Sequence, residues 1–498
     1  MKTAQTILAL AAAAAWIAPA AVADGLAGSR PNIILVMTDD QGYGDLGCHG
    51  NPVIQTPNLD RMYEQSVRLT DFQVSPTCSP TRASLMTGRH EFKSGVTHTI
   101  FERERLGLHA TTIAEVLNRA GYATGIFGKW HLGDEADHQP DQRGFDEVYI
   151  HGAGGIGQTY AGSCGDAPGN EYFDPALTHN GKFVKTKGYC TDLFFAQALK
   201  WIEQQSAEDG PFFAYITPNA PHGPLVSPGP QYDKLYEGKT MNGKKLNEGD
   251  IAFYSMITNI DDNMGKLLER VDQLGIAGDT LVIFMTDNGG THTRLFSAGM
   301  RAGKGSPYEG GTHVPSFWRW PGTLSEGVDV DALTAHIDYF PTFVELAGTE
   351  TPEGVKPDGR SLVPLLEDPG AAWADRYIFV HQGRWPKGQA EAAKFKNCAV
   401  RNSRFRLVNN RELYDLQADP GETTNVIDEH PQVVSAMREA YDAWWQEALA
   451  GMVNEDAVGP KINPVKARYW KQFGGGPDAA LLERMDPAQS ERLQGRRR

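Results

Sequence analysis

The sequence predicts an α/β fold: a large, doubly wound, mostly parallel β-sheet with helices on both faces, followed by a smaller C-terminal α+β subdomain. From residue 31 to about residue 322, short apolar runs alternate with amphipathic helical stretches, which is typical of such a sheet. Beyond about residue 370, short strand-like runs precede one long amphipathic helix. We therefore expect a large α/β domain over residues 24–370, and a short antiparallel sheet with one helix over residues 371–452.

Four strands are predicted for the large sheet, and all but the second are expected to be buried, because they are short apolar runs without polar alternation. The four strands cover residues 32–37, 123–127, 212–217 and 281–285. A helix is predicted over residues 111–121, which combine threonine caps, apolar residues at helical spacing and a closing glycine. A longer helix, with apolar residues from Ile251 to Val271, precedes the fourth strand.

Three other segments complete the predicted organisation. Residues 152–188 are rich in Gly, Asn, Asp and Tyr and lack a helical period, which predicts a loop-rich insertion over one end of the sheet that sets specificity. In the C-terminal subdomain we expect strands at 377–381, 399–408 and 411–416, and a helix at 431–452 whose aromatic residues pack on them. Residues 453–498, interrupted by Pro and Gly and ending in three arginines, are expected to be a solvated extension.

The first 23 residues are typical of a secretory signal peptide. Lys2 precedes an apolar run from Ile7 to Ile17, and small residues at 21–23 form a cleavage site. The run is too short to span a bilayer, and no cysteine follows the cleavage site for lipid attachment. We expect an exported mature chain that begins near Asp24, in the periplasm or outside the cell, without a membrane anchor.

The net charge and the cysteine content indicate which partners and which disulfides to expect. The net charge of -15 argues against a nucleic acid partner, because phosphate binding needs a basic face. The chain has five cysteines, an odd number for an exported protein. Apart from Cys78, Cys164 and Cys190 flank the insertion and could form a disulfide. Cys48 and Cys398 fit equally well as small buried hydrophobic residues.

Residues 78–89, with the sequence CSPTRASLMTGR, are the most informative segment. Pro80 suits the first turn of a helix, so Cys78 is expected at a helix N-terminus, where free N–H groups favour negative charge. Arg82, one turn later, adds a cation on the same side. A buried structural cysteine is the alternative, which a lone Cys-x-Pro would favour but this longer pattern does not.

Two predicted strands end in nearly the same sequence, Met-Thr-Asp39-Asp40 and Met-Thr-Asp287-Asn288. Ligands of an open α/β sheet bind at the carboxyl ends of its strands, so these side chains are expected to face one another. A single acidic pair would more simply cap a turn, but carboxylates crowded together need a cation between them. An all-oxygen donor set favours a hard divalent ion, calcium or magnesium.

Further cationic side chains follow predicted strands. Lys129 and His131 lie in Gly-Lys-Trp-His-Leu-Gly, His222 lies in Asn-Ala-Pro-His-Gly-Pro, and Lys304 lies in Gly-Lys-Gly, shortly before Tyr-Glu-Gly-Gly. Any one of them alone would more often be a solvated surface group or a hydrogen-bonded core histidine. The weaker candidates are His292, Arg294, Arg301, His98 and His151.

Together these motifs resemble the type I sulfatases, the formylglycine-dependent, arylsulfatase-like enzymes of the alkaline phosphatase superfamily. Their signature reads Cys-x-Pro-x-Arg followed by Thr-Gly, and the resemblance covers residues 32 to about 426. It implies that a maturation enzyme oxidises Cys78 to formylglycine, whose hydrate is the nucleophile. It also implies a metal site and a substrate-facing set. The implied metal ligands are Asp39, Asp40, Asp287, Asn288 and the modified residue 78. The implied substrate-facing residues are Arg82, Lys129, His131, His222 and Lys304, with His292 and Arg294 as additional substrate-binding candidates.

The expected function is that of a sulfuric ester hydrolase that removes sulfate from a sulfated carbohydrate or an aryl sulfate. We expect Asp287 to accept a proton from the nucleophile, His222 to protonate the leaving alcohol and His131 to remove the proton that releases sulfate. The alternatives are a phosphonate monoester or phosphodiester hydrolase of the same superfamily, and a non-catalytic binder of sulfated glycans. A cysteine hydrolase would leave the aspartate cluster unexplained.

Overall fold

The computed structural model describes residues 25–486. The predicted signal peptide, residues 1–23, and the three terminal arginines lie outside the described residues. Within the described range, no helix has both the length and the apolar character needed to cross a membrane.

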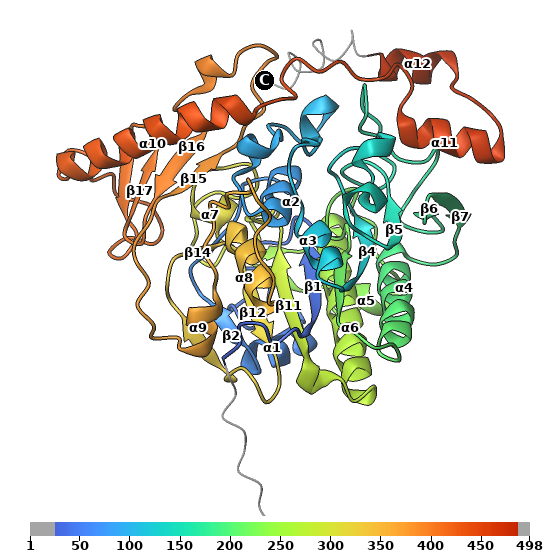
Figure 1. Cartoon of the computed structure of the whole chain (residues 1–498), viewed down its shortest axis with the longest axis horizontal. Helices are drawn as coiled ribbons and strands as arrows, with labels where there is room; N and C mark the ends of the chain where they lie inside the picture. Colours follow the sequence, from blue (N-terminus) through green and yellow to red (C-terminus); the bar gives the residue numbers. More distant parts are fainter. Residues whose placement is uncertain (1–24, 487–498) are drawn as a thin grey trace, which may run out of the picture.

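A ten-stranded sheet forms the centre of the molecule (Figure 1). Its five central strands β11, β1, β8, β4 and β5 are parallel, whereas β12, β6 and β7 pair antiparallel with their neighbours. In spatial order the strands are β13 (Val328–Val330), β2 (Val67–Leu69), β12 (Ser316–Arg319), β11 (Thr280–Thr286), β1 (Asn32–Thr38), β8 (Phe212–Thr217), β4 (Ala123–Lys129), β5 (Glu147–His151), β6 (Ala176–His179) and β7 (Lys182–Lys185). The four strands predicted from apolar runs are β1, β4, β8 and β11.

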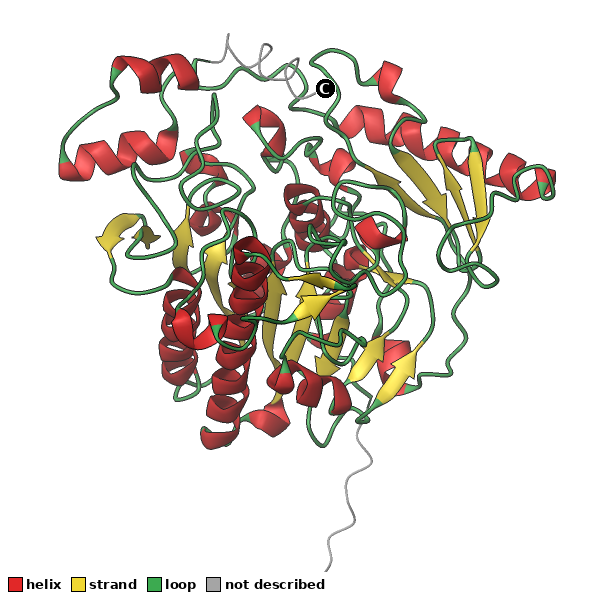
Figure 2. Ribbon diagram, turned by 180° about the vertical axis from the view of Figure 1, so that it is seen from behind, coloured by secondary structure: helices red, strands yellow, loops and turns green. Residues whose placement is uncertain are grey.

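Helices cover both faces of this sheet, and each face has its own hydrophobic core (Figures 1 and 2). One face carries α2 (Cys78–Thr87), α3 (Ile113–Arg119), α8 (Tyr339–Leu346) and α9 (Val363–Glu367). The other carries α1 (Pro57–Glu64), α4 (Cys190–Gln205) and α6 (Glu248–Gln273). The minor elements are α5 (Pro230–Asp233), α7 (Glu309–Thr312), the pair β3 (Phe72–Gln73) and β14 (Thr334–Ala335), and the pair β9 (Thr240–Met241) and β10 (Lys244–Lys245).

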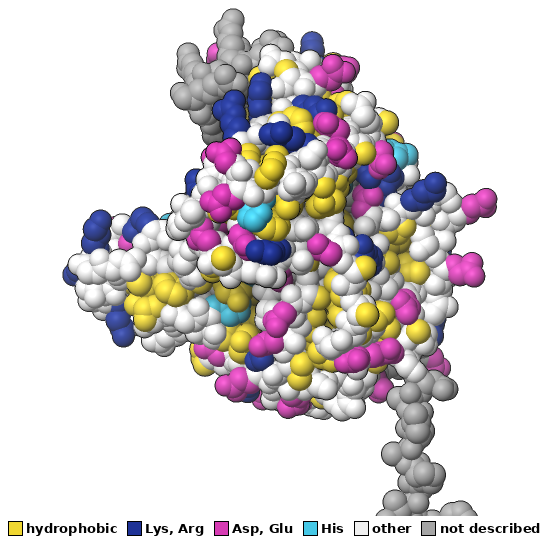
Figure 3. Space-filling view, turned by 90° about the vertical axis from the view of Figure 1, so that its left-hand side faces the viewer, with side chains coloured by type: hydrophobic (Ala, Val, Ile, Leu, Met, Phe, Trp, Pro, Cys, Tyr) yellow, Lys and Arg dark blue, Asp and Glu magenta, His cyan; other side chains and the backbone are white. Residues whose placement is uncertain are grey.

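A four-stranded antiparallel sheet forms the C-terminal subdomain, as the sequence predicts. It consists of β15 (Ile378–His381), β16 (Cys398–Arg401), β17 (Phe405–Val408) and β18 (Glu412–Asp415), with α10 (Pro431–Gly451) packed on it. The single strand expected at 399–408 is a hairpin, because Asn402 accepts a hydrogen bond from the N–H of Phe405 through its side chain and forms a turn. Acidic and basic side chains are interspersed on this side of the molecule (Figure 3).

The segments at 152–188 and 453–486 differ from their predictions. The first contributes β6 and β7, so it extends the sheet as well as covering it. The second is not a solvated extension over its described part. It contains α11 (Pro464–Phe473) and α12 (Ala479–Met485), and the carboxamide of Asn463 donates to the carbonyl of Ser163 at 2.6 Å. Buried Lys466 donates to the carbonyl of Asp166 at 2.6 Å, so the tail docks on the insertion. Hydropathy alone underestimated this contact because its partners are backbone carbonyls.

The possible disulfide between Cys164 and Cys190 is not formed. All five cysteines are free thiols. Cys190 begins α4, and its thiol lies 3.4 Å from Oδ1 of Asn219, whereas Cys164 is buried within the insertion. In sequence, Cys164 lies inside the insertion and Cys190 directly after it, and the fold gives each thiol a separate buried environment.

Candidate active site

The carboxyl ends of β1 and β11 bring the two acidic pairs together. The strands pair in parallel, with Thr38 opposite Thr286, so the residues that follow each strand lie side by side. The backbone N–H of Asp40 donates to Oδ1 of Asp287 at 3.1 Å, and the amide of Asn288 donates to Oδ1 of Asp40 at 3.0 Å. Residues separated by almost 250 positions therefore form one cluster at the edge where α/β sheets bind ligands.

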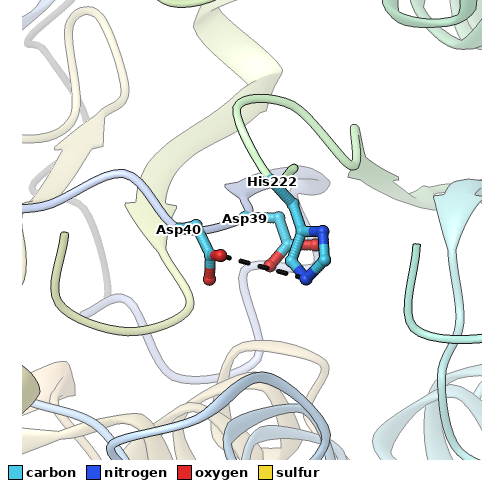
Figure 4. Close-up of side chains that lie close together, drawn as sticks. All are labelled: Asp39, Asp40 and His222. Carbon is cyan, nitrogen blue, oxygen red and sulfur yellow. Dashed lines mark ion pairs between the residues drawn. The ribbon is translucent and has the colours of Figure 1, made fainter. Parts of the chain in front are cut away.

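Cys78 is the first residue of α2 and is almost completely buried beside this cluster. One ligand atom from each of Asp39, Cys78 and Asp287 lies within 4.8 Å of the others. A second group of the same compactness contains Asp39, Asp40 and His222, and Figure 4 shows these three side chains converging from the end of β1 and from a separate loop. The two groups share Asp39.

Three cations contact the three carboxylates, one each. Nζ of Lys129 lies 2.5 Å from Oδ2 of Asp39, and Lys304 forms an ion pair with Oδ1 of Asp40.

Arg82 donates to Oδ2 of Asp287 at 3.1 Å and to the carbonyl of Lys129 at 3.0 Å. Its side chain is 1% exposed. Arg82 is therefore buried against Asp287, and the substrate-facing role expected from the sequence stays a prediction.

Two oxygen atoms of the cluster have no hydrogen-bond partner among residues 25–486. They are Oδ1 of Asp39 and Oδ1 of Asn288, and both are buried. Leaving a buried acceptor unpaired costs roughly 1–3 kcal/mol, so native proteins rarely leave such atoms without a ligand. A carboxylate oxygen and an amide oxygen beside further carboxylates are the donors that calcium and magnesium prefer. The residues present therefore fit a hard divalent ion.

The pKa values of the three aspartates follow from their burial and from their ion pairs. Burial raises the pKa of Asp39 to about 6, against the opposing effect of Lys129. Burial and the neighbouring Asp39 raise the pKa of Asp287 to about 7. Burial would also raise the pKa of Asp40, but Lys304 and His222 hold it below its ordinary value. The crowded carboxylates thus repel one another, and a cation bound between them would relieve this repulsion.

At the thiol of Cys78, the effect of Lys129 and Lys304 outweighs that of the nearby carboxylates of Asp287 and Asp40. Burial alone would raise its pKa, but the ammonium groups of Lys129 and Lys304 bring it below the ordinary value. The same field would stabilise any other anion at this position, including the oxygens of a sulfate ester.

His222 is placed to exchange a proton beside Asp40. Its Nδ1 lies 2.7 Å from the carbonyl of Gly223, so Nδ1 carries the hydrogen, and its Nε2 points to Oδ2 of Asp40 at 3.9 Å. Burial and the two lysines lower its pKa, which favours the neutral ring.

His131 has the complementary arrangement. Its Nε2 lies 2.8 Å from the carbonyl of Thr99 and so carries the hydrogen, whereas Nδ1 is buried without a partner among the described residues. Burial, with Lys129 nearby, lowers its pKa well below the ordinary value. Its unprotonated Nδ1 is therefore available as an acceptor.

Two glycines of the insertion pack directly on these histidines. A Cβ atom at Gly154 would lie 2.5 Å from the ring of His131, and one at Gly155 would lie 3.0 Å from Nδ1 of His222. Neither contact was predicted. The glycine-rich sequence directly after β5 was a usable signal, because strand-end glycines often mark close backbone approach to a ligand site.

The weaker candidates lie outside this cluster or have other partners. His292 stacks on Phe253 with ring centroids 4.2 Å apart, and Arg294 forms an ion pair with Asp250 at the start of α6. Arg301 lies over Tyr308 and donates to the hydroxyl of Tyr414 at 2.7 Å, which links the loop of Arg301 to β18. His98 and His151 are buried and bonded to nearby backbone groups.

Comparison with known proteins identifies the family of the chain. The family model described as Sulfatase matches residues 31–349, which include every residue of the cluster, from Asp39 to Lys304. The chain belongs to the sulfatase family. A second model, described as N-sulphoglucosamine sulphohydrolase, C-terminal, matches residues 303–444 of this sulfatase.

Several sulfatases are similar over most of their length. Human (Homo sapiens) arylsulfatase A is 31% identical over 471 residues, covering 84% of this chain and 89% of its own. N-acetylgalactosamine-6-sulfatase of Rattus norvegicus is 31% identical over 386 residues, covering 71% and 68%. Among solved structures, Ps i-CgsB in complex with k-i-k-neocarrahexaose has a TM-score of 0.73 and 27% identity, covering 91% of this chain and 99% of that one. The chain is thus a sulfatase with the predicted fold, and sulfatases generally use a metal ion and a formylglycine.

Proposed function

We propose that this sulfatase removes sulfate from sulfated carbohydrates. The reaction uses a formylglycine, made from Cys78, and a divalent ion, which we propose is calcium. The observation that carries the proposal is the buried cluster in which Cys78, Asp39 and Asp287 lie within 4.8 Å of one another. The unpaired oxygens of Asp39 and Asn288 support an oxygen-liganded ion there. Asp39, Asp40, Asp287, Asn288 and residue 78 would hold it.

The modified residue and the ion would together supply an oxygen nucleophile of lowered pKa, which a soft thiolate beside a hard cation would not. Lys129 and Lys304 bind sulfate oxygens, because their ammonium groups already favour negative charge at position 78. Arg82 orients Asp287, which accepts the proton of the nucleophile.

The two histidines divide the remaining proton transfers. In its protonated form, which the carboxylate of Asp40 3.9 Å from Nε2 favours, His222 gives the Nε2 proton to the departing alcohol oxygen and keeps the Nδ1 hydrogen on the carbonyl of Gly223. His131 accepts a proton at its unpaired Nδ1 when sulfate is released. His292 and Arg294, in a neighbouring loop, are proposed as outer contacts for the substrate.

The carbohydrate assignment rests on similarity, since the related Ps i-CgsB is bound to a neocarrahexaose and another relative is an N-acetylgalactosamine-6-sulfatase. We also propose that residues 1–23 export the protein to the periplasm or the exterior, where such glycans occur.

Sulfate release from defined sulfated saccharides, measured beside 4-nitrophenyl sulfate and 4-nitrophenyl phosphate, tests the function. Turnover of the phosphate ester above that of the sulfate ester would favour a phosphoesterase instead. Sulfated glycan binding without any sulfate release by protein carrying the modified residue 78 would favour a binding protein.

A further inference from the structure

A polar cavity of about 160 Å³ lies in the C-terminal subdomain, in the segment between β15 and β16. Its lining includes the polar and cationic side chains of Gln382, Arg384, Gln389 and Lys396, together with Trp385. None of the described residues that line it is acidic. Nothing in the reaction proposed above uses this cavity.

The cavity adjoins the active site on two sides. A Cβ atom at Gly305, the residue after Lys304, would lie 3.2 Å from Nε2 of Gln382. On the other side, Nη2 of Arg384 donates to Oγ1 of Thr99 at 3.0 Å, and the carbonyl of Thr99 binds His131. Side chains of the lining therefore contact the loop of Lys304 and the loop that positions His131.

The backbone of the lining is held in a specific conformation against the site. Gly383 has φ +67°, and a Cβ atom there would lie 2.2 Å from the carbonyl oxygen of Thr97. Arg384 follows with φ +64°, which is uncommon for a residue with a side chain, and its N–H donates to the same carbonyl at 3.0 Å. Such conformations persist where the surroundings enforce them, and they concentrate at ligand sites.

Lys396 makes the cavity attractive to anions. Its side chain is exposed, and no carboxylate oxygen of the described residues lies within 4 Å of its Nζ. A cation in a cavity without acidic groups creates a positive electrostatic potential there, which attracts anions. The carboxamide of Gln382, which has no hydrogen-bond partner among residues 25–486, offers a donor and an acceptor suited to sugar hydroxyls.

We propose that this cavity is a subsite for a second anionic group, a sulfate or a carboxylate, on a sugar that neighbours the one losing its sulfate at Cys78. Lys396 binds the anion, and Gln382 binds a hydroxyl between the cavity and Lys304. The inference rests on the proposed carbohydrate function and deepens it. The enzyme accordingly prefers polyanionic oligosaccharides to sulfated monosaccharides.

The test compares Lys396→Ala and Gln382→Ala with the wild type on two kinds of substrate. The small substrate is 4-nitrophenyl sulfate, which does not reach the cavity. The large substrates are oligosaccharides of carrageenan, chondroitin sulfate and heparan sulfate, each assayed beside its sulfated monosaccharide. Lys200→Ala, which replaces an exposed lysine in the C-terminal half of α4, is the matched control.

Each cavity variant should lower kcat/KM for the preferred oligosaccharide about tenfold, mainly through KM, because each loses one hydrogen bond to a charged or polar partner. Turnover of 4-nitrophenyl sulfate should stay within about twofold for all variants. Added salt should raise the oligosaccharide KM more steeply for the wild type than for Lys396→Ala, because salt screens the exposed charge.

Equal losses on both kinds of substrate, or oligosaccharide kinetics that neither variant changes, would overturn the subsite while leaving the carbohydrate function intact. A wild-type enzyme that hydrolyses 4-nitrophenyl sulfate but none of the saccharides would overturn the carbohydrate function itself, and the subsite with it.

Discussion

Lys129 and Asp39 form an ion pair of 2.5 Å between two side chains that have no solvent exposure, one at the end of β4 and the other at the end of β1. The pair uses Oδ2 of Asp39 and leaves Oδ1 without a partner among the described residues. The lysine therefore neutralises the carboxylate and fixes its orientation, so that one oxygen remains directed into the site. Both strands end at the same edge of the sheet, which makes this contact possible.

Removing the lysine should destabilise the protein as well as inactivate it. In Lys129→Met, Asp39 would remain buried without its cation, and breaking a buried pair in this way costs about 3–5 kcal/mol. Urea denaturation in the presence of EDTA measures the change in the free energy of unfolding. Lys200→Met, an exposed substitution, should change it by less than about 0.5 kcal/mol. Equal stabilities for the two variants would show that the pair has no structural importance.

Cys78 should be chemically modified in active protein. Mass spectrometry of the peptide that contains it should find an aldehyde in place of the thiol, and a hydrazide probe should label it. Cys78→Ala should lose turnover while its free energy of unfolding changes by about 1 kcal/mol, since the side chain is small. Substantial sulfate release by Cys78→Ala would contradict the role given to this residue.

Removal of the divalent ion should lower both stability and turnover. A ligand present at a hundredfold excess over its dissociation constant stabilises the folded state by about 2.7 kcal/mol, so calcium should raise the Tm of EDTA-treated protein. Asp39→Asn should abolish this rise, whereas Asp329→Asn, on the edge strand β13, should retain it. A larger rise with magnesium or zinc than with calcium would reassign the ion.

Glu309 should make stability depend on pH. Burial would raise its pKa, but Arg401 and Arg406 hold it well below the ordinary value. Because the folded state has the lower pKa, this carboxylate stabilises the protein above about pH 4.5, and its contribution is lost as the pH falls toward the folded-state pKa. Glu309→Gln should therefore cost about 3–5 kcal/mol at pH 7, with a smaller difference from the wild type at pH 4. Urea titrations at both pH values measure this, and exposed Glu326→Gln should follow the wild type throughout.

The docked tail should protect the insertion. Asn463→Ala would remove hydrogen bonds to the carbonyls of Ser163 and Gly162 as well as the N-cap of α11. Amide hydrogen exchange at residues 152–188 should then become faster, because opening of that segment becomes less costly. Asp478→Ala, which removes only the N-cap of α12, should leave exchange there unchanged. Unchanged protection in Asn463→Ala would mean that the tail contributes nothing to the order of the insertion.

Local patterns predicted four of the ten strands of the large sheet, namely β1, β4, β8 and β11. Buried parallel strands such as β8 are continuous apolar runs, and their ends carry the polar residues, so the acidic pairs at Asp39 and Asp287 were readable before the fold was known. The direction in which Arg82 points was not readable, because helical spacing places it on the correct side of α2 but cannot tell that Asp287 lies there to receive it. The roles of Gly154 and Gln382 depend on contacts between distant loops, which no local period encodes.

The carboxamide of Gln472 in α11 bonds to both backbone groups of Phe183, its oxygen accepting from the N–H at 2.8 Å and its nitrogen donating to the carbonyl at 2.7 Å. Phe183 lies on β7, the last strand of the sheet. One side chain thereby occupies the position that an additional strand would take, at an edge where unpaired backbone invites self-association. Loss of α11 would expose a template for intermolecular pairing, so proteolytic trimming of this helix would be expected to cause aggregation before it causes unfolding.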